Sequence, residues 1–244
     1  MGLALRTSLV GSLALLLHGC ALPIIGSPRS QRSDSTVQTA TPAQQRARAE
    51  LAALPPEACY QRLRSAHVPF EPVPPDDARG VNAPLRLLGP IDGVEVTSRN
   101  GETLNAVLDC RLALALLAWA PSLRAAGVER LEHYSIYRPG ARTPRKGQLS
   151  GHARGLAIDA ARFHLMHGAG TLDVLTDWEE RDRGGAPCPQ RSHEARPSRL
   201  LRSVVCDAVA RNLFQVVLTP HHDRAHENHV HLELKPEVSW TYVR

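Results

Sequence analysis

SGHARGLAID, residues 150–159, is the stretch of this sequence that decides the fold around it. Apolar residues alternate with others from Leu156 onward, which is typical of a strand, and the alternation puts Ala157 and Asp159 on the same face. A carboxylate on a face of alanines is costly to bury without a partner, and a metal ion is one such partner. Arg154 offers the alternative, a salt bridge within the core. The stretch therefore predicts a strand that carries either a metal ligand or an ion-paired aspartate.

Three histidines near the C-terminus supply further groups that a metal site would need. They follow the pattern His226-x-x-His229-x-His231, and alternation puts His229, His231 and Glu233 on one face of a strand. The apolar face of that strand is expected to pack on the core, so the histidines are expected to line a pocket.

Four side chains are candidates for a zinc site: His152, Asp159, His229 and His231. Catalytic zinc commonly has three protein ligands and keeps one position for water. Two ligands on alternate residues of one strand are physically possible, so spacing does not separate a ligand from a proton-carrying base. A zinc ion with bound water would make the protein a hydrolase.

Length and composition favour one compact domain with appendages, because 244 residues that are 43% hydrophobic can bury one good core. The net charge is +5, but Lys146 and Lys235 are the only lysines, and the arginines are spread without a dense run or interleaved aromatic residues. That pattern does not indicate nucleic-acid binding. It is compatible with the carboxylates and phosphates of a cell envelope.

The N-terminus has the features of an export signal. A short apolar run, residues 9–17, precedes Leu17-His18-Gly19-Cys20, which resembles a bacterial lipobox. We expect a lipoprotein-type signal peptide over residues 1–19, with Cys20 lipidated as the mature N-terminus; an ordinary cleaved signal or an uncleaved anchor is the alternative. Residues 20–45 are expected to be a flexible tether and residues 46–244 the folded domain. This organisation predicts the periplasmic side of a bacterial membrane.

The remaining cysteines fit an oxidising compartment. They are even in number, which favours two disulfides, and proximity favours Cys59 with Cys110 and Cys188 with Cys206 among three possible connectivities. A Cys/His zinc site is the competing use, but no C-x-x-C spacing is present.

The pattern of the remaining chain predicts an α+β domain, with helices flanking a small antiparallel sheet that carries the zinc site. Residues 179–196 are charged and polar and are expected to be an exposed insertion. Helices are expected over 46–54, 56–66, 108–123 and 197–214, and strands over 93–99, 129–137, 156–164, 172–175, 216–218 and 230–234.

Two motifs resemble those of peptidoglycan peptidases. Residues 150–159 are similar to the S-x-H-x-x-G-x-A-x-D motif of zinc peptidases that cleave D-amino-acid bonds, the D-Ala-D-Ala peptidases and their relatives. Residues 226–231 are similar to the H-x-x-H-x-H of penicillin-insensitive murein endopeptidases. Asn228 stands where the D-Ala-D-Ala enzymes have a glutamate, so the resemblance favours the endopeptidase-like branch.

Along most of its length the chain resembles the bacterial extensin-like C-terminal domain family. The resemblance covers about Cys59 to Glu233 and rests on short blocks spread through that range. These blocks are Cys59, Asp109-Cys110-Arg111, Tyr137-Arg138-Pro139-Gly140, Ser150 to Asp159, Leu213 to Leu218 and His226 to Leu232.

The resemblance implies a role for each residue of the site. It implies that the zinc ligands are His152, Asp159 and His231, that His229 is the general base or acid, that His226 is a substrate-contacting or supporting group, and that Arg138 stabilises an oxyanion or holds a substrate carboxylate. For Arg138 alone, a surface salt bridge is the alternative.

The expected function is that of an envelope-anchored zinc metallopeptidase that hydrolyses an amide bond in peptidoglycan stem peptides. A peptidoglycan-binding or scaffolding lipoprotein without turnover is a second hypothesis. A periplasmic zinc-binding or metal-delivery protein is a third, because His221, His222 and His226 could form an additional labile site.

Overall fold

The computed structural model describes Gly2 and residues 36–99, 101, 104–143, 147–179, 186–188 and 193–244. The chain divides into residues 1–31 and residues 32–244, and the fold given below is that of the second unit. The expected lipidation site, Cys20, and all of the expected signal peptide except Gly2 lie outside the described residues, as do residues 20–35 of the expected tether.

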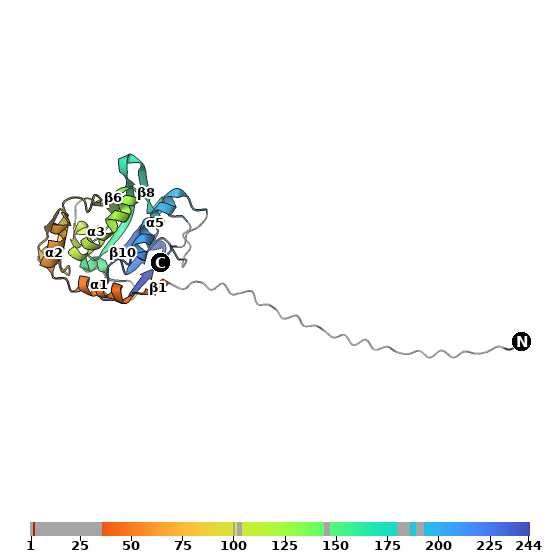
Figure 1. The fold of residues 1–244 in the computed structure, drawn as a ribbon, viewed down its shortest axis with the longest axis horizontal. Coiled ribbons are helices and arrows are strands. Elements are labelled where there is room, and N and C mark those ends of the chain that lie inside the picture. The colour runs from red at the N-terminus through yellow and green to blue at the C-terminus, as the bar shows by residue number, and fades with distance from the viewer. Residues whose placement is uncertain are drawn as a thin grey trace. The chain divides into compact units, whose positions relative to one another are not determined.

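The domain is built on a mixed eight-stranded sheet (Figure 1). Its strand order is β1-β11-β9-β10-β7-β6-β4, and β8 pairs with β7. The strands are β1 (Thr36–Thr39), β4 (Glu95–Ser98), β6 (Val128–His133), β7 (Ala157–Leu165), β8 (Gly170–Asp173), β9 (Val216–Leu218), β10 (Val230–Glu233) and β11 (Trp240–Val243). A second, antiparallel sheet contains β2 (Phe70–Pro72), β3 (Pro84–Leu87) and β5 (Leu108–Asp109).

The expectation of a small antiparallel sheet is wrong in size and in strand direction. The pairs β4–β6 and β9–β11 are parallel, whereas β7 pairs antiparallel with β6, β8 and β10. Both parallel pairs join strands that are distant in sequence, which is why local alternation did not reveal them. The mixed helix and strand content agrees with an α+β class.

The helices in the described part of the chain are α1 (Pro42–Ala52), α2 (Pro56–Ser65), α3 (Cys110–Ala125), α4 (Val174–Asp177) and α5 (Arg196–Ala210), together with short 3-10 turns. Helix α3 is the central one and contacts α2, α5 and β6 (Figure 1). Its Trp119 is fully buried, packs edge-on against Phe163 and Phe214, and donates a hydrogen bond from its indole to the Val204 carbonyl. None of these helices has the length and apolar character needed to cross a membrane.

Several element boundaries differ from the expected ones because capping side chains set them. Asp109 caps α3 by accepting the Arg111 amide, so the helix begins at Cys110 while residues 108–109 pair as β5. Asp173 similarly accepts the Leu175 amide, which ends β8 and begins α4 where a single strand was expected. The strand expected over 129–137 runs only over 128–133.

Regular structure begins before the expected domain boundary at residue 46. Residues 36–39 form β1, which pairs antiparallel with β11 at the end of the chain. Helix α1 then begins at Pro42 with a capping box between Thr41 and Gln44.

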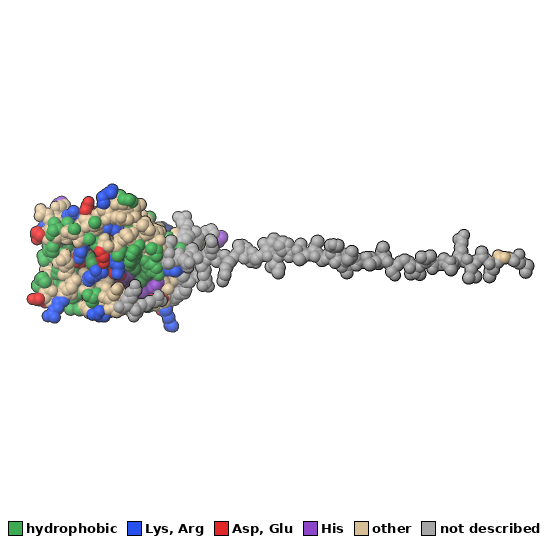
Figure 2. Space-filling model, turned by 90° about the horizontal axis from the view of Figure 1, so that it is seen from below, with side chains coloured by type: hydrophobic (Ala, Val, Ile, Leu, Met, Phe, Trp, Pro, Cys, Tyr) green, Lys and Arg blue, Asp and Glu red, His purple; other side chains and the backbone are tan. Residues whose placement is uncertain are grey.

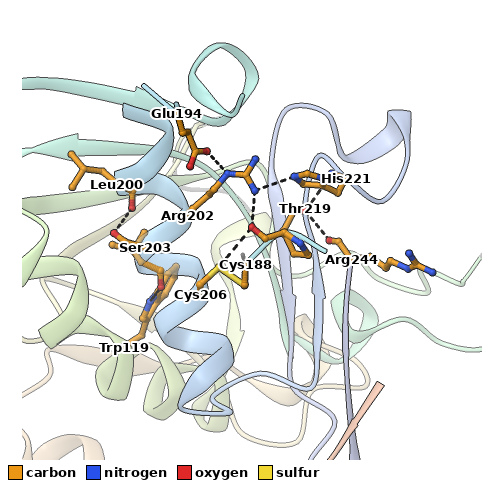
Figure 3. Close-up of a disulfide and its surroundings, with 12 residues drawn as sticks. Trp119, Cys188, Glu194, Leu200, Arg202, Ser203, Cys206, Thr219, His221 and Arg244 are labelled. Atoms are coloured by element: carbon orange, nitrogen blue, oxygen red, sulfur yellow. Dashed lines mark hydrogen bonds and ion pairs between the residues drawn. A yellow bond between two sulfur atoms is a disulfide. The ribbon is translucent and has the colours of Figure 1, made fainter. Parts of the chain in front are cut away.

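Two disulfides form in the pairing favoured by proximity. Cys59–Cys110 joins α2 to the start of α3, and Cys188–Cys206 joins the 179–196 insertion to α5 (Figure 3). Each bond ties a helix to a separate part of the chain, which reduces the conformational freedom of the unfolded state.

The 179–196 insertion is not wholly exposed, contrary to the sequence expectation. Arg202 of α5 is buried, forms an ion pair with buried Glu194, and donates hydrogen bonds to the carbonyls of Glu179 and Pro187 (Figure 3). One of the charged residues of this segment, Glu194, therefore forms an internal ion pair instead of facing solvent. Residues 180–185 and 189–192 of the insertion lie outside the described residues.

Candidate metal centre

Strands β7 and β10 bring the two halves of the sequence motif together. Their antiparallel register makes Asp159 and His231 direct partners, so the two side chains project from the same face. Asp159 Oδ1 lies 3.0 Å from His231 Nδ1, and both residues are buried.

His152 reaches the same point from the 3-10 turn that precedes β7, Gly151–Arg154. The turn ends at Gly155 in the left-handed conformation (φ 63°), where a Cβ would lie 2.9 Å from the Asp109 backbone nitrogen, so the position requires glycine. His152 Nε2 lies 3.1 Å from Asp159 Oδ1 and 3.1 Å from His231 Nδ1.

In His152 and in His231, one ring nitrogen points away from Asp159, and its hydrogen bond determines which nitrogen of the ring carries the proton. His152 Nδ1 lies 2.8 Å from the Ile136 carbonyl, which can only accept, so Nδ1 carries the proton. His231 Nε2 lies 3.2 Å from Glu233 Oε2 and donates to that carboxylate. In neutral rings this leaves the lone pairs of His152 Nε2 and His231 Nδ1 directed at Asp159 Oδ1. Three buried acceptors that converge without a donor between them repel one another, and a cation among them would remove that repulsion.

These atoms fit a zinc ion. Two ligands at zinc bonding distance and tetrahedral geometry lie about 3.3–3.4 Å apart, close to the separations of 3.0–3.1 Å measured here. Two imidazoles and a carboxylate are a common zinc donor set, and each outer imidazole nitrogen has a carbonyl or carboxylate partner of the kind that fixes metal-binding histidines. His152, Asp159 and His231 could therefore hold zinc through Nε2, Oδ1 and Nδ1.

The electrostatics of the centre also favour a cation. Burial disfavours ionised Asp159, but its close interactions with the imidazoles of His152 and His231 outweigh burial and hold the pKa of Asp159 well below its usual value. Burial lowers the pKa of His231, yet hydrogen bonds to Asp159 and Glu233 raise it overall to about 9. Protonation of His231 and binding of a metal ion are thus alternative ways to place positive charge among these atoms.

His229 lies beside the centre and differs from the three convergent residues. Its Nε2 is 3.4 Å from Asp159 Oδ1, while its Nδ1 is 2.8 Å from the side-chain oxygen of Asn228 and donates to it. Burial lowers the pKa of His229 to about 4, despite the opposing charge of Asp159. At neutral pH its Nε2 is therefore unprotonated and lies beside the point where the three ligand atoms converge. Tyr134 packs edge-on against the His229 ring.

Arg138 and His226 border the same place. Arg138 Nη2 is 3.8 Å from Asp159 Oδ2, and the Arg138 side chain remains 51% exposed, so it can reach a bound molecule. His226 packs against His229 with ring centroids 5.1 Å apart, and its own Nδ1 is 2.6 Å from Asp223 Oδ1. The structure therefore brings all six predicted site residues into one region.

Two supporting residues were not predicted as part of the site. Ser135 donates a hydrogen bond of 3.0 Å to Asp159 Oδ2, and Glu233 accepts from His231. Strand alternation placed Glu233 on the same face as His231, so the sequence pattern could have identified Glu233 as a site residue. Ser135 lies in a loop, where no such pattern indicates a role. Arg154, the alternative partner for Asp159, instead lies near Glu233 and Glu237.

Gly151 makes room for Glu233 below the centre. A Cβ on Gly151 would lie 2.6–2.8 Å from side-chain atoms of Glu233, closer than real contacts allow. The carboxylate of Glu233 is also 3.3 Å from Lys235 Nζ, which partly neutralises its buried charge. The glycine of the motif therefore has a packing role that its spacing alone did not reveal.

The fold and this cluster define an α+β protein with a buried His-Asp-His centre between two antiparallel strands. The chain belongs to the extensin-like protein C-terminus family, whose family model matches residues 57–244. That range contains every residue of the centre, and the match confirms the expected resemblance to the extensin-like family. No curated protein and no solved structure matches the chain.

Proposed function

We propose that this protein is a zinc metallopeptidase that hydrolyses an amide bond in peptidoglycan peptides. The convergence of His152 Nε2, Asp159 Oδ1 and His231 Nδ1 within 3.1 Å of one another carries the proposal. A zinc ion held there would supply a Lewis acid and a water molecule whose pKa is lowered to about 7.

His229 is the proton carrier in this proposal. Its Nε2 is unprotonated at neutral pH and stands 3.4 Å from Asp159 Oδ1, and Asn228 fixes the orientation of the ring. It accepts the proton of the attacking water and delivers it to the nitrogen of the leaving amine. Asn228 is thus a positioning residue for His229 in this chain.

Arg138 is the substrate-facing cation. Its guanidinium is half exposed at the edge of the centre, where it can stabilise the oxyanion that forms during attack or bind a carboxylate of a stem peptide. Ser135 and Glu233 hold Asp159 and His231 in place from the other side. His226 contributes a second imidazole next to His229.

An envelope location is part of the proposal. Both disulfides require an oxidising compartment, and the lipobox-like segment that ends at Cys20 would attach the protein to a membrane on its periplasmic side. Among the side chains that Figure 2 draws in colour, basic and acidic ones are interspersed with neutral ones and form no continuous basic patch on the face displayed. That distribution suits contact with a mixed, acidic wall polymer better than tracking of a nucleic-acid backbone.

Digestion of purified peptidoglycan, followed by mass spectrometry of the released fragments, tests the proposal. The full-length zinc-loaded protein is expected to release peptide fragments, and His229→Ala is expected to retain zinc while the rate falls by about 10²–10⁴-fold. His231→Ala is expected to lose both zinc and activity. His67→Asn is the matched control, because His67 is exposed and has the positive φ (56°) that asparagine tolerates.

Two outcomes would contradict the proposal. Unchanged release of fragments by His231→Ala would exclude the metal mechanism. Zinc-loaded protein that co-sediments with peptidoglycan without releasing any fragment would favour a binding or scaffolding role.

A further inference from the structure

A second group of side chains that are able to bind a metal ion lies in the loop between β9 and β10. It consists of His222, Asp223 and His226, each of which offers one ligand atom, and the three atoms lie within 4.8 Å of one another. His221, the neighbour that the sequence placed with this group, is fully buried and accepts a hydrogen bond from Arg202 instead (Figure 3). Asp223 takes its place as the third donor.

The loop is held in shape by bonds that do not use all of these donors. The backbone nitrogen of His226 donates to the Asp223 carbonyl and to Asp223 Oδ1, both at 3.2 Å. The backbone nitrogen of His222 donates to the Thr219 carbonyl at 2.8 Å. Backbone hydrogen bonds and the cap that Asp223 Oδ1 provides for His226 close the loop, so its arrangement does not depend on a bound ion.

The donor atoms of the three side chains lie close enough together that a small shift would arrange them around one ion. Asp223 stands between the two imidazoles, with Oδ1 2.6 Å from His226 Nδ1 and Oδ2 3.4 Å from His222 Nε2. The histidine rings pack edge-on at 5.1 Å between centroids, and His222 also packs against Tyr242. Asp223 is 49% exposed, so it can shift to close the group around an ion.

We infer that His222, Asp223 and His226 form a second zinc-binding site, separate from the His152-Asp159-His231 centre. Two imidazoles and one carboxylate suit zinc and similar divalent transition metals better than magnesium or calcium, which prefer oxygen ligands. The second site is more open than the first, because its histidine side chains are 28% and 18% exposed while His152 is 1% exposed. It therefore binds zinc more weakly and exchanges it more readily.

The second site touches the first centre and the neighbouring His229 through two ring contacts of His226. His226 lies 5.1 Å from His229 and 6.1 Å from His231, measured between ring centroids. Zinc bound at His226 would fix that ring beside the proposed proton carrier and add positive charge at the entrance to the centre. The site thus goes beyond the proposed function and does not require that any peptide be cleaved.

Zinc stoichiometry tests this inference. Metal-free full-length protein is dialysed against a series of buffered free-zinc concentrations, and bound zinc is measured by inductively coupled plasma mass spectrometry. The wild type is expected to bind about two equivalents, one at lower free zinc than the other. His222→Asn and Asp223→Asn are each expected to bind about one equivalent, with the tighter step unchanged; asparagine at 223 keeps the cap of the turn.

The reciprocal variant makes the result independent of peptidase activity. His152→Asn removes a ligand of the first centre and is expected to keep the weaker zinc-binding step. The double variant His152→Asn/His222→Asn is expected to lose that step as well. His67→Asn is expected to behave as the wild type, which controls for a lost surface histidine. Saturation of the wild type at one equivalent, or a weaker step that survives in His222→Asn, would overturn the inference even if the protein proves to be a peptidase.

Discussion

Asp159 of β7 and His231 of β10 are direct cross-strand partners, with Asp159 Oδ1 3.0 Å from His231 Nδ1. The contact joins residues separated by most of the C-terminal half of the domain, and His152 completes it from the turn before β7. Because both strands are buried in the sheet, the geometry of the centre is set by rigid backbone. Side chains that hold the ligands in position, such as Ser135 and Glu233, should therefore affect metal affinity as well as stability.

Glu233 should control zinc affinity through the orientation of His231. Glu233→Ala removes the acceptor of the His231 Nε2 proton and is expected to weaken zinc binding about 10–100-fold, whereas Glu233→Gln keeps an acceptor and should lose much less. Competition with a chromophoric chelator measures both affinities. Equal affinities for the Ala and Gln variants would show that the hydrogen bond does not position His231.

Gly151 should be intolerant of a side chain for a steric reason. Gly151→Ala places a Cβ against Glu233 and is expected to destabilise the fold by roughly 1–3 kcal/mol, measured by urea unfolding. In a Glu233→Ala background the obstructing atoms are gone, so the same substitution should cost less. A double-mutant cycle without such coupling would rule out the contact as the cause.

His133 should make the stability depend on pH. It is buried with an unpartnered Nδ1, and burial lowers its pKa to about 4. The unfolded chain, with a histidine pKa near 6.5, binds the proton more readily, so the free energy of unfolding should fall as pH drops from about 6.5 towards 4. At pH values well above 6.5 this histidine is neutral in both states and contributes no slope.

Replacement by leucine isolates the contribution of His133. Between pH 7 and pH 4 the stability of His133→Leu should fall by about 3 kcal/mol less than that of the wild type, measured by urea unfolding of the metal-free protein at each pH. Other acid-titrating groups are common to both proteins and cancel in the comparison. Parallel pH profiles for the two proteins would contradict the assigned pKa.

The buried ion pair between Arg202 and Glu194 should be essential to the region around the Cys188–Cys206 disulfide (Figure 3). Glu194→Ala leaves a buried guanidinium without its carboxylate and is expected to cost about 3–5 kcal/mol of stability. The matched control is Glu57→Ala, which breaks the exposed pair with Arg64 and should cost at most about 1 kcal/mol. Similar losses of melting temperature in both variants would argue against a buried pair.

Sequence reasoning succeeded where the relevant interaction is local. Strand alternation placed His231 and Glu233 on one strand face and Asp159 on the alanine face of its own strand, and these side chains do meet in the structure, because the side-chain period of a strand is two whatever the strand pairs with. Sequence proximity found both disulfides. Sequence reasoning failed where a capping side chain sets a helix boundary or an ion pair sets the burial of a segment. The cap at Asp109 makes α3 begin at Cys110, and the ion pair with Arg202 buries Glu194 of the insertion that was expected to be exposed.

By itself the sequence indicated the family and the α+β class, favoured one disulfide pairing among three, and supplied a set of candidate metal ligands. The tertiary structure decided which atoms of that set converge. The register of β7 and β10 puts His231 opposite Asp159 and leaves His229 at the edge, and long-range pairing makes the sheet mixed. The physical reason is that residue type and period are fixed along the chain, whereas register depends on how distant strands bury their apolar faces together.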